Sequence, residues 1–206
     1  MTQTLILLFH PDLAGSRANR ALASAARSLP GVDLVDMAAI YPDGLDMARD
    51  GEREAARLLA AERIVLQFPV QWYSTPPLLK SWQDAVLTRM MYLAPDTEGR
   101  LLAGKPVMVA ATAGNTAESY RPGGRNLFAM DALLAPLRAT AHRCALIWTA
   151  PFVLYEAKTL APEALEAAAE AYAARLAAWR TETSAEAAAW VVSRKWWKLE
   201  GSVISR

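Results

Sequence analysis

The sequence is poor in cysteine, in net charge and in long hydrophobic runs, and each shortage excludes a class of protein. Cys144 is the only cysteine among 206 residues, so no intrachain disulfide can form and a cytoplasmic location is expected. The net charge of +1 gives no bulk attraction to nucleic acid or to anionic lipid. No stretch approaches the ~18 uninterrupted apolar residues of a membrane span. We therefore expect a cytoplasmic globular protein that does not bind nucleic acid.

Two nucleotide-binding fingerprints are also missing. The chain contains neither GxGxxG nor GxxxxGK[ST], so neither the standard dinucleotide site nor a P-loop is expected. The apolar segment at 4–9 is short, lacks a basic flank and runs directly into a polar turn. It is therefore predicted to be a buried first strand and not a signal peptide.

Short apolar runs alternate with helical patterns along the chain. Strands are expected at 4–9, 32–37, 63–68, 105–112 and 144–149. Helices are expected at 16–29, 51–62, 76–90, 126–141 and about 162–181. Pro136 should kink the fourth helix. The alternation favours an α/β fold with a parallel sheet covered on both faces, and five strands suit the doubly wound, flavodoxin-like order 2-1-3-4-5.

The chain is expected to divide into a flavodoxin-like domain at 1–180 and a C-terminal extension at 181–206. The extension carries Trp190, Trp196 and Trp197, which suit packing on the same domain or on a partner subunit. Its "SRKWW" mixes basic and aromatic residues, but one short cluster in a nearly neutral chain favours packing over nucleic-acid binding.

In a doubly wound sheet, a ligand binds beyond the carboxyl ends of the strands, where the strand order reverses. The loops that should meet there are 10–19, 69–77 and 112–126. The first loop has His10 and places Ser16, Arg17 and Asn19 at the start of a helix. A helix N-terminus binds phosphate readily, although Ser16 could equally be a simple N-cap and His10 a histidine bonded to backbone.

The second loop places Trp72 and Tyr73 among three prolines. Rigid aromatic side chains of this kind could form a wall against a planar ring, with the backbone N–H groups of 70–73 at its polar edge. The alternative is that both rings pack on a neighbouring helix or across a dimer interface.

The third loop offers Thr112, Gly114 and Asn115, followed by Tyr120. Small residues after a strand allow a ligand to approach the backbone closely, and the alternative is a flexible surface loop.

The three loops resemble those of the flavodoxin-like NAD(P)H:quinone oxidoreductase family. The stretches that carry the resemblance are "HPDLAGSRAN", "FPVQWYSTPPLLKSWQD" and the segment that begins "TAGNTAESYRPGGRN". They are most similar to the bacterial branch that includes the ancillary oxidoreductases of glutathione-gated potassium-efflux systems, in which "YPD" (41–43) is also typical. The resemblance covers roughly residues 3–180.

The resemblance implies a non-covalent FMN or FAD, NAD(P)H as co-substrate, a quinone as acceptor, no metal ion, and a homodimer. It implies a ping-pong cycle, in which hydride passes from NAD(P)H through flavin N5 to the quinone. Tyr120 is the catalytic residue implied, beside the flavin where nicotinamide or quinone stacks. The implied cofactor-binding residues are His10, Ser16, Arg17, Ala18, Asn19, Pro69, Val70, Gln71, Trp72, Tyr73, Ala111, Thr112, Ala113, Gly114 and Tyr120.

The sequence departs from the family pattern in two regions. Ala111 and Ala113 stand where the family often has threonine and glycine, which removes one hydroxyl and stiffens one turn. Asn126 is nearest to a position where vertebrate-like members have a histidine. Asparagine cannot shuttle a proton, so proton delivery would fall to Tyr120 or to water.

Two other functions remain open at this stage. The protein could be a redox-responsive regulatory subunit of a potassium-efflux transporter, peripheral to the inner face of the membrane. It could also be a one-electron flavodoxin carrier, although such carriers are usually strongly acidic and this chain is nearly neutral.

Overall fold

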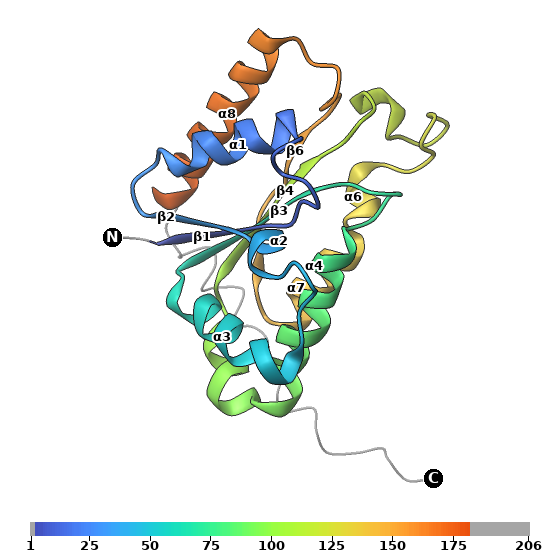
Figure 1. Ribbon diagram of the computed structural model, residues 1–206. Helices are drawn as coiled ribbons and strands as arrows, with labels where there is room; N and C mark the ends of the chain where they lie inside the picture. The colour runs from blue at the N-terminus through green and yellow to red at the C-terminus, as the bar shows by residue number, and fades with distance from the viewer. Residues whose placement is uncertain (1–2, 182–206) are drawn as a thin grey trace.

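The computed structural model describes residues 3–181, which form a parallel sheet with helices on both faces (Figure 1). The sheet contains β1 (Thr4–Leu8), β2 (Val32–Asp36), β3 (Arg63–Pro69), β4 (Pro106–Thr112), β5 (Ile147–Trp148) and β6 (Phe152–Leu154). The strand order is β2-β1-β3-β4-β5, and β6 also pairs with β4. The predicted fold class and order are confirmed.

The predicted fifth strand is wrong in its extent, because two short strands share its place beside β4. β5 pairs with Pro106 and Val107, and β6 pairs with Ala110 to Thr112. Between them lies Pro151, which has no backbone N–H to donate to β4. The sheet therefore has six strands in five positions.

Two helices cover one face of the sheet, and several helical segments cover the other (Figure 1). The first face carries α1 (Arg17–Arg27) and α8 (Pro162–Thr181). The second carries α2 (Met37–Ile40), α3 (Met47–Ala60), α4 (Pro77–Trp82), α5 (Arg100–Leu102), α6 (Met130–Leu133) and α7 (Ala135–Arg143). The chain between α4 and α5 continues as π-helical turns: η1 (Gln83–Leu87), η2 (Arg89–Leu93) and η3 (Pro95–Gly99).

Two helix starts differ from the prediction. α3 begins at Met47 because the side chain of Asp46 caps it, accepting the N–H of Arg49 at 2.9 Å. The predicted helix at 126–141 begins only at Met130 and is broken at Leu134, which leaves Pro136 in the first turn of α7, where proline is tolerated. The disturbance predicted for Pro136 is thus a break between two helices.

Within residues 3–181, no helix is both long enough and apolar enough to cross a bilayer. Residues 182–206 lie outside the described part of the chain, so the packing expected of Trp190, Trp196 and Trp197 stays a prediction.

Candidate functional site

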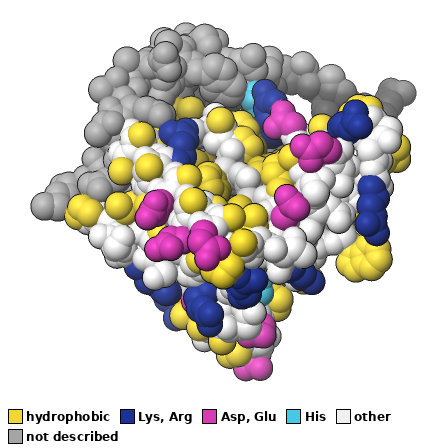
Figure 2. Space-filling model, turned by 90° about the horizontal axis from the view of Figure 1, so that it is seen from above, with side chains coloured by type: hydrophobic (Ala, Val, Ile, Leu, Met, Phe, Trp, Pro, Cys, Tyr) yellow, Lys and Arg dark blue, Asp and Glu magenta, His cyan; other side chains and the backbone are white. Residues whose placement is uncertain are grey.

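The carboxyl ends of β1, β3 and β4 lie side by side and bring the three predicted loops together. Leu8 pairs with Gln67, and Pro69 pairs with Thr112. Just past the strands, Val70 donates its N–H to the carbonyl of Thr112 at 2.8 Å. Figure 2, a view from above, shows acidic, basic and hydrophobic side chains interspersed on the face turned to the viewer. Ligand recognition must therefore rest on individual groups in the loops.

The first loop is shaped by its own hydrogen bonds. Ser16 is the N-cap of α1, and its hydroxyl accepts the N–H of Asn19 at 3.2 Å. Asp12 accepts the N–H of Gly15 at 3.0 Å, and a Cβ at Gly15 would clash with the Asp12 carboxylate. The amides of Arg17 and Ala18, in the first turn, have no acceptor within the helix, which makes them available to an anion.

His10 lies at the base of this loop with a defined tautomer. Its Nδ1 accepts the N–H of Asp12 at 3.0 Å. Burial lowers the pKa of the His10 imidazole below its ordinary value. A neutral ring that accepts at Nδ1 carries its proton on Nε2, so His10 offers one N–H donor. Both readings of His10, a backbone-bonded histidine and a phosphate ligand, are compatible in one geometry.

Two of the predicted site residues turn inward. Asn19 donates to the hydroxyl of Thr112 at 2.9 Å, and both side chains are buried. Gln67 donates to the carbonyl of Asn19 at 3.1 Å, and Tyr172 contacts Gln67 from α8 at 3.4 Å. The side chains of Asn19 and Thr112 therefore join the first and third loops beneath the surface of the site. Neighbouring residues of the two loops form the surface itself. Arg17 also turns aside and donates to the carbonyl of Leu160 at 3.2 Å.

The second loop is a tight turn with both central residues in the left-handed region. Gln71 and Ser74 exchange backbone hydrogen bonds of 3.0 Å, and between them Trp72 has φ 45° and Tyr73 has φ 64°. This is a type I′ geometry, which normally selects Asn-Gly or Gly-Gly. Trp72 is 93% exposed, and within residues 3–181 no acceptor is found for the amides of Trp72 or Tyr73.

Such strain persists where surrounding structure holds it, and it is concentrated at functional sites. Here the prolines at 69, 76 and 77 restrict the backbone on both sides of the turn. The result is a restricted turn that presents two aromatic side chains and two open N–H groups beyond the carboxyl end of β3.

The third loop adds the side chain of Tyr120 and a side-chain amide, that of Asn126, whose nitrogen has no hydrogen-bond partner within the described residues. Burial raises the pKa of Tyr120, and the neighbouring Tyr73 and Tyr155 raise it further, so the hydroxyl stays protonated at neutral pH. The rings of Tyr120 and Tyr155 lie 5.6 Å apart. Asn126 is buried and accepts from Asn115 at 3.2 Å, but its own amide nitrogen has no partner within the described chain.

The alanines of this loop leave little side chain in front of the backbone. Ala111 and Ala113 are buried, and Ala113 donates its N–H to the carbonyl of Leu154 at 2.8 Å. Gly114 faces open space, since an added Cβ would meet no atom within 4 Å. A ligand edge can therefore approach the backbone at Gly114 but not the amide of Ala113.

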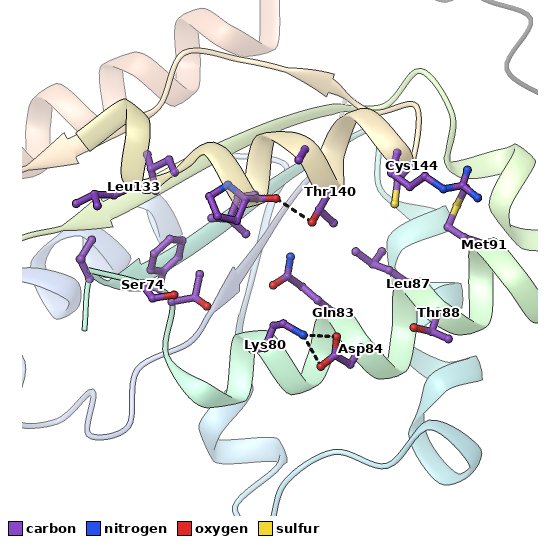
Figure 3. Close-up of a pocket in the computed structure, with 18 of the residues that line it drawn as sticks. Ser74, Lys80, Gln83, Asp84, Leu87, Thr88, Met91, Leu133, Thr140 and Cys144 are labelled. Atoms are coloured by element: carbon purple, nitrogen blue, oxygen red, sulfur yellow. Dashed lines mark hydrogen bonds and ion pairs between the residues drawn. The ribbon is translucent and has the colours of Figure 1, made fainter. Parts of the chain in front are cut away.

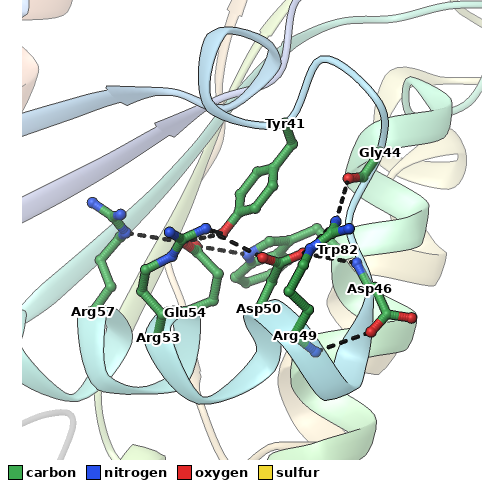
Figure 4. Close-up of polar contacts among 9 residues, drawn as sticks. All are labelled: Tyr41, Gly44, Asp46, Arg49, Asp50, Arg53, Glu54, Arg57 and Trp82. Carbon is green, nitrogen blue, oxygen red and sulfur yellow. Dashed lines mark hydrogen bonds and ion pairs between the residues drawn. The ribbon is translucent and has the colours of Figure 1, made fainter.

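A buried carboxylate behind the second loop was missed by sequence reasoning. Glu54 is fully buried and accepts from the hydroxyl of Tyr41 at 2.8 Å, from the indole of Trp82 at 3.2 Å and from Arg57 at 3.2 Å (Figure 4). Trp82 in turn packs edge-on against Phe9, with ring centroids 5.8 Å apart. The network thus connects α3 to α4 and to the strand end before His10.

These features fit a planar, hydrogen-bonding ring with an anionic tail. The open amides at Arg17 and Ala18 and the His10 Nε2–H suit the anion. The exposed aromatic turn and the orphaned amide of Asn126 suit a ring with polar edges.

Known proteins are similar to this chain in sequence and in fold over most of its length. A family model described as a flavodoxin-like fold matches residues 2–178. The glutathione-regulated potassium-efflux system ancillary protein KefG of Pectobacterium carotovorum is 38% identical over 84% of this chain and 92% of its own length. General stress protein 14 of Treponema denticola, solved in complex with FMN, is 31% identical with a TM-score of 0.75, covering 85% of this chain and 98% of that one. An NADPH-quinone reductase of P. pentosaceus is 26% identical with a TM-score of 0.72, covering 88% and 99%.

Proposed function

The chain belongs to the family with the flavodoxin-like fold, and from this premise we propose that it is an FMN-dependent NAD(P)H:quinone oxidoreductase. FMN is proposed because a relative with the same fold was solved with it, and the quinone because another relative is an NADPH-quinone reductase. The observation that carries the proposal is the strained Trp72–Tyr73 turn, which holds two rings and two open amides where a flavin ring would lie.

Each loop has a separate part in holding the flavin. The His10 Nε2–H and the amides of Arg17 and Ala18 would bind its phosphate. Trp72 and Tyr73 would cover the ring and donate their amides to its edge. Gly114 would leave room for the opposite edge, and Asn126 would donate the amide that lacks a partner.

When bound, the flavin supplies two-electron chemistry: NAD(P)H and a proton reduce the quinone to the hydroquinone, leaving NAD(P)⁺. The protein positions the two substrates in turn against the same ring, so no side chain has to form a covalent bond. The protonated hydroxyl of Tyr120 can donate a hydrogen bond to a quinone oxygen. Tyr120→Phe removes this hydrogen-bond donor, and Asn126 cannot replace it as a proton carrier, so quinone reduction should become slower. It should not be abolished, because water can still deliver the proton.

The proposal is tested by loading the purified protein with FMN without oxygen and adding one equivalent of NADPH. We expect the yellow absorbance of the flavin to be lost, and to return when a quinone is added. Trp72→Ala should weaken FMN binding about tenfold or more, since aromatic contacts with ring systems contribute about 1–3 kcal/mol. The matched control is Leu101→Ala, which also removes an exposed apolar side chain but lies in α5, outside the three site loops. Bound FMN that NADPH fails to bleach would contradict the assignment.

We also propose a homodimer in which the second copy covers the open side of the site. Its support is the exposure of three large apolar side chains at two of the site loops, Trp72, Leu127 and Phe128. Solvent-exposed groups of this size are typical of surfaces buried on association. Light scattering should give twice the chain mass, and Phe128→Asp should lower it to that of one chain.

A second function, as an ancillary subunit of a potassium-efflux transporter, is favoured by the similarity to KefG. This function would place the cytoplasmic protein against the inner face of the membrane. Co-purification with such a transporter from membranes, without measurable quinone turnover, would favour it over the enzyme.

A further inference from the structure

A groove runs away from the aromatic turn between two groups of helices. One wall is the continuous helical rod of α4, η1 and η2, and the other is α6 followed by α7 (Figure 3). Its volume is about 440 Å³, which is within the usual range for small-molecule pockets. Lys80 and Met91, near opposite ends of the rod, both line it.

The floor of the groove is apolar. It is formed by Leu87, Leu134, Leu137 and Cys144, which are all buried. A separate cavity of about 30 Å³ shares Leu87 and Leu137 as lining. An apolar chain that lies against this floor would be partly removed from water.

The charges at the rim of the groove are already engaged. Lys80 pairs with Asp84 on the same helical face, and the guanidinium of Arg143 lies 5.2 Å from the ring centroid of Tyr92. In Figure 3, the neutral polar side chains of Gln83 and Thr140 lie between the two walls, and Ser74, Thr75 and Thr88 also line the groove. A neutral, mostly apolar occupant fits this lining better than an ionic one.

The groove is continuous with the site of the proposed reaction. Val70, Tyr73 and Ser74 belong to the second loop of that site and also line the near end of the groove. A ligand whose ring stacks at Tyr73 can therefore extend an attached chain directly between the helices.

We propose that the groove binds the apolar side chain of the quinone acceptor, so that the preferred acceptors are prenylated quinones and not tail-less ones. This inference rests on the proposed function for the ring, but the groove itself is defined by its own residues. A neutral, apolar floor that is continuous with the ring site suits a flexible chain attached to the ring. Each methylene group buried there can strengthen binding about fourfold at most.

The experiment fills the groove from one wall. Ala139 is exposed on α7 and lines the groove, so Ala139→Trp should occupy it without entering the core. Thr88→Trp does the same from the opposite wall, and keeps the test decisive if the first variant fails to fold. Ala171→Trp, at an exposed position of α8 on the other face of the sheet, is the matched control.

Two readouts are measured for each FMN-loaded variant. The first is the ratio of kcat/KM for a farnesyl naphthoquinone to that for the same naphthoquinone without a side chain. We expect this ratio to fall at least tenfold in the groove variants, through KM, and to stay unchanged in Ala171→Trp. The second is the binding of farnesol, a prenyl chain without a quinone ring, followed by calorimetry, which should be lost in the same two variants.

The outcomes separate the groove from the reaction. An unchanged ratio together with unchanged farnesol binding would overturn the inference. If no quinone is reduced, the proposed function fails, and the farnesol titration alone decides the groove: loss of binding in Ala139→Trp supports a chain-binding site, and retained binding overturns it. Groove variants that change only the mass of the particle in light scattering would assign the groove to a second copy and overturn the inference.

Discussion

The two faces of the sheet are both covered by helices, but the helices are packed differently on each face. On one face, α1 and α8 lie against the strands, and Tyr172, Leu176 and Trp179 of α8 are almost completely buried. On the other face, α3, the rod of α4, η1 and η2, and α7 also bury a large core, but they leave the groove of about 440 Å³ between the rod and α7. The first face is closed, and the second is open to a ligand.

The difference follows from the residues that build each face. α1 and α8 are rich in alanine, which lets two helices approach closely over a long contact. The open face is made from a rod with π-helical turns and from helices interrupted before Pro136. Irregular turns of this kind are frequent at functional sites. We infer that the closed face supports the loops and the open face binds the substrate.

The largest expected effect comes from the polar groups buried on each face. Glu54, on the open face, is a carboxylate bonded to Tyr41, Trp82 and Arg57. Glu54→Leu should lower the free energy of unfolding by about 3–5 kcal/mol, because it leaves the buried Tyr41 hydroxyl and Trp82 indole N–H without an acceptor, at about 1–3 kcal/mol each. Gln67, equally buried behind the closed face, bonds only to neutral groups, and Gln67→Leu should cost about 1–3 kcal/mol. Urea unfolding of both variants measures the two values, and equal values would contradict this contrast.

The second prediction compares the same truncation on both faces. Leu176 is fully buried on the closed face, whereas Leu137 borders the groove. Leu176→Ala should lower the free energy of unfolding by about 4 kcal/mol, and Leu137→Ala should lower it by about 2 kcal/mol. The difference is expected because a new cavity costs most where the surrounding side chains cannot move in to fill it. Urea denaturation under identical conditions is the measurement. A larger loss for Leu137→Ala would mean that the groove is filled in solution.

The contrast also shows what a sequence can predict. The strands could be predicted because each is a short apolar run, and their order because crossovers between parallel strands are right-handed. Trp72 and Tyr73 could be predicted as candidate site residues because large aromatics among prolines are unusual in a loop. The inward turn of Asn19 could not be predicted, because its position is fixed by Gln67, which itself bonds to Tyr172, 105 residues away.

Two further features lie beyond local patterns. The groove depends on the spacing between helices that are far apart in the sequence, and the π-helical turns have no clear residue signature. The left-handed turn at Trp72 and Tyr73 opposes the preferences of both residues, so local propensity argues against it. Such a conflict is expected where function, and not stability, selects the residues.

The smallest effect is the one that tests this conflict directly. Tyr73 has φ 64°, a conformation that a residue with a Cβ adopts at a cost of roughly 1–2 kcal/mol. Tyr73→Gly should therefore raise the free energy of unfolding by up to about 1 kcal/mol, after the extra entropy of glycine in the unfolded chain is subtracted. The same change should weaken FMN binding, because it removes a ring that we propose covers the flavin.

Ala145 provides the control for this prediction, since it also has a positive φ, of 53°, but lies after α7, away from the three loops. Ala145→Gly should stabilise the protein by a similar amount and leave FMN binding unchanged. Thermal unfolding of the FMN-free proteins and titration with FMN separate the two effects. If Tyr73→Gly instead destabilises the FMN-free protein while Ala145→Gly stabilises it, Tyr73 contributes packing to its own chain, and the turn is not strained for the sake of the ligand.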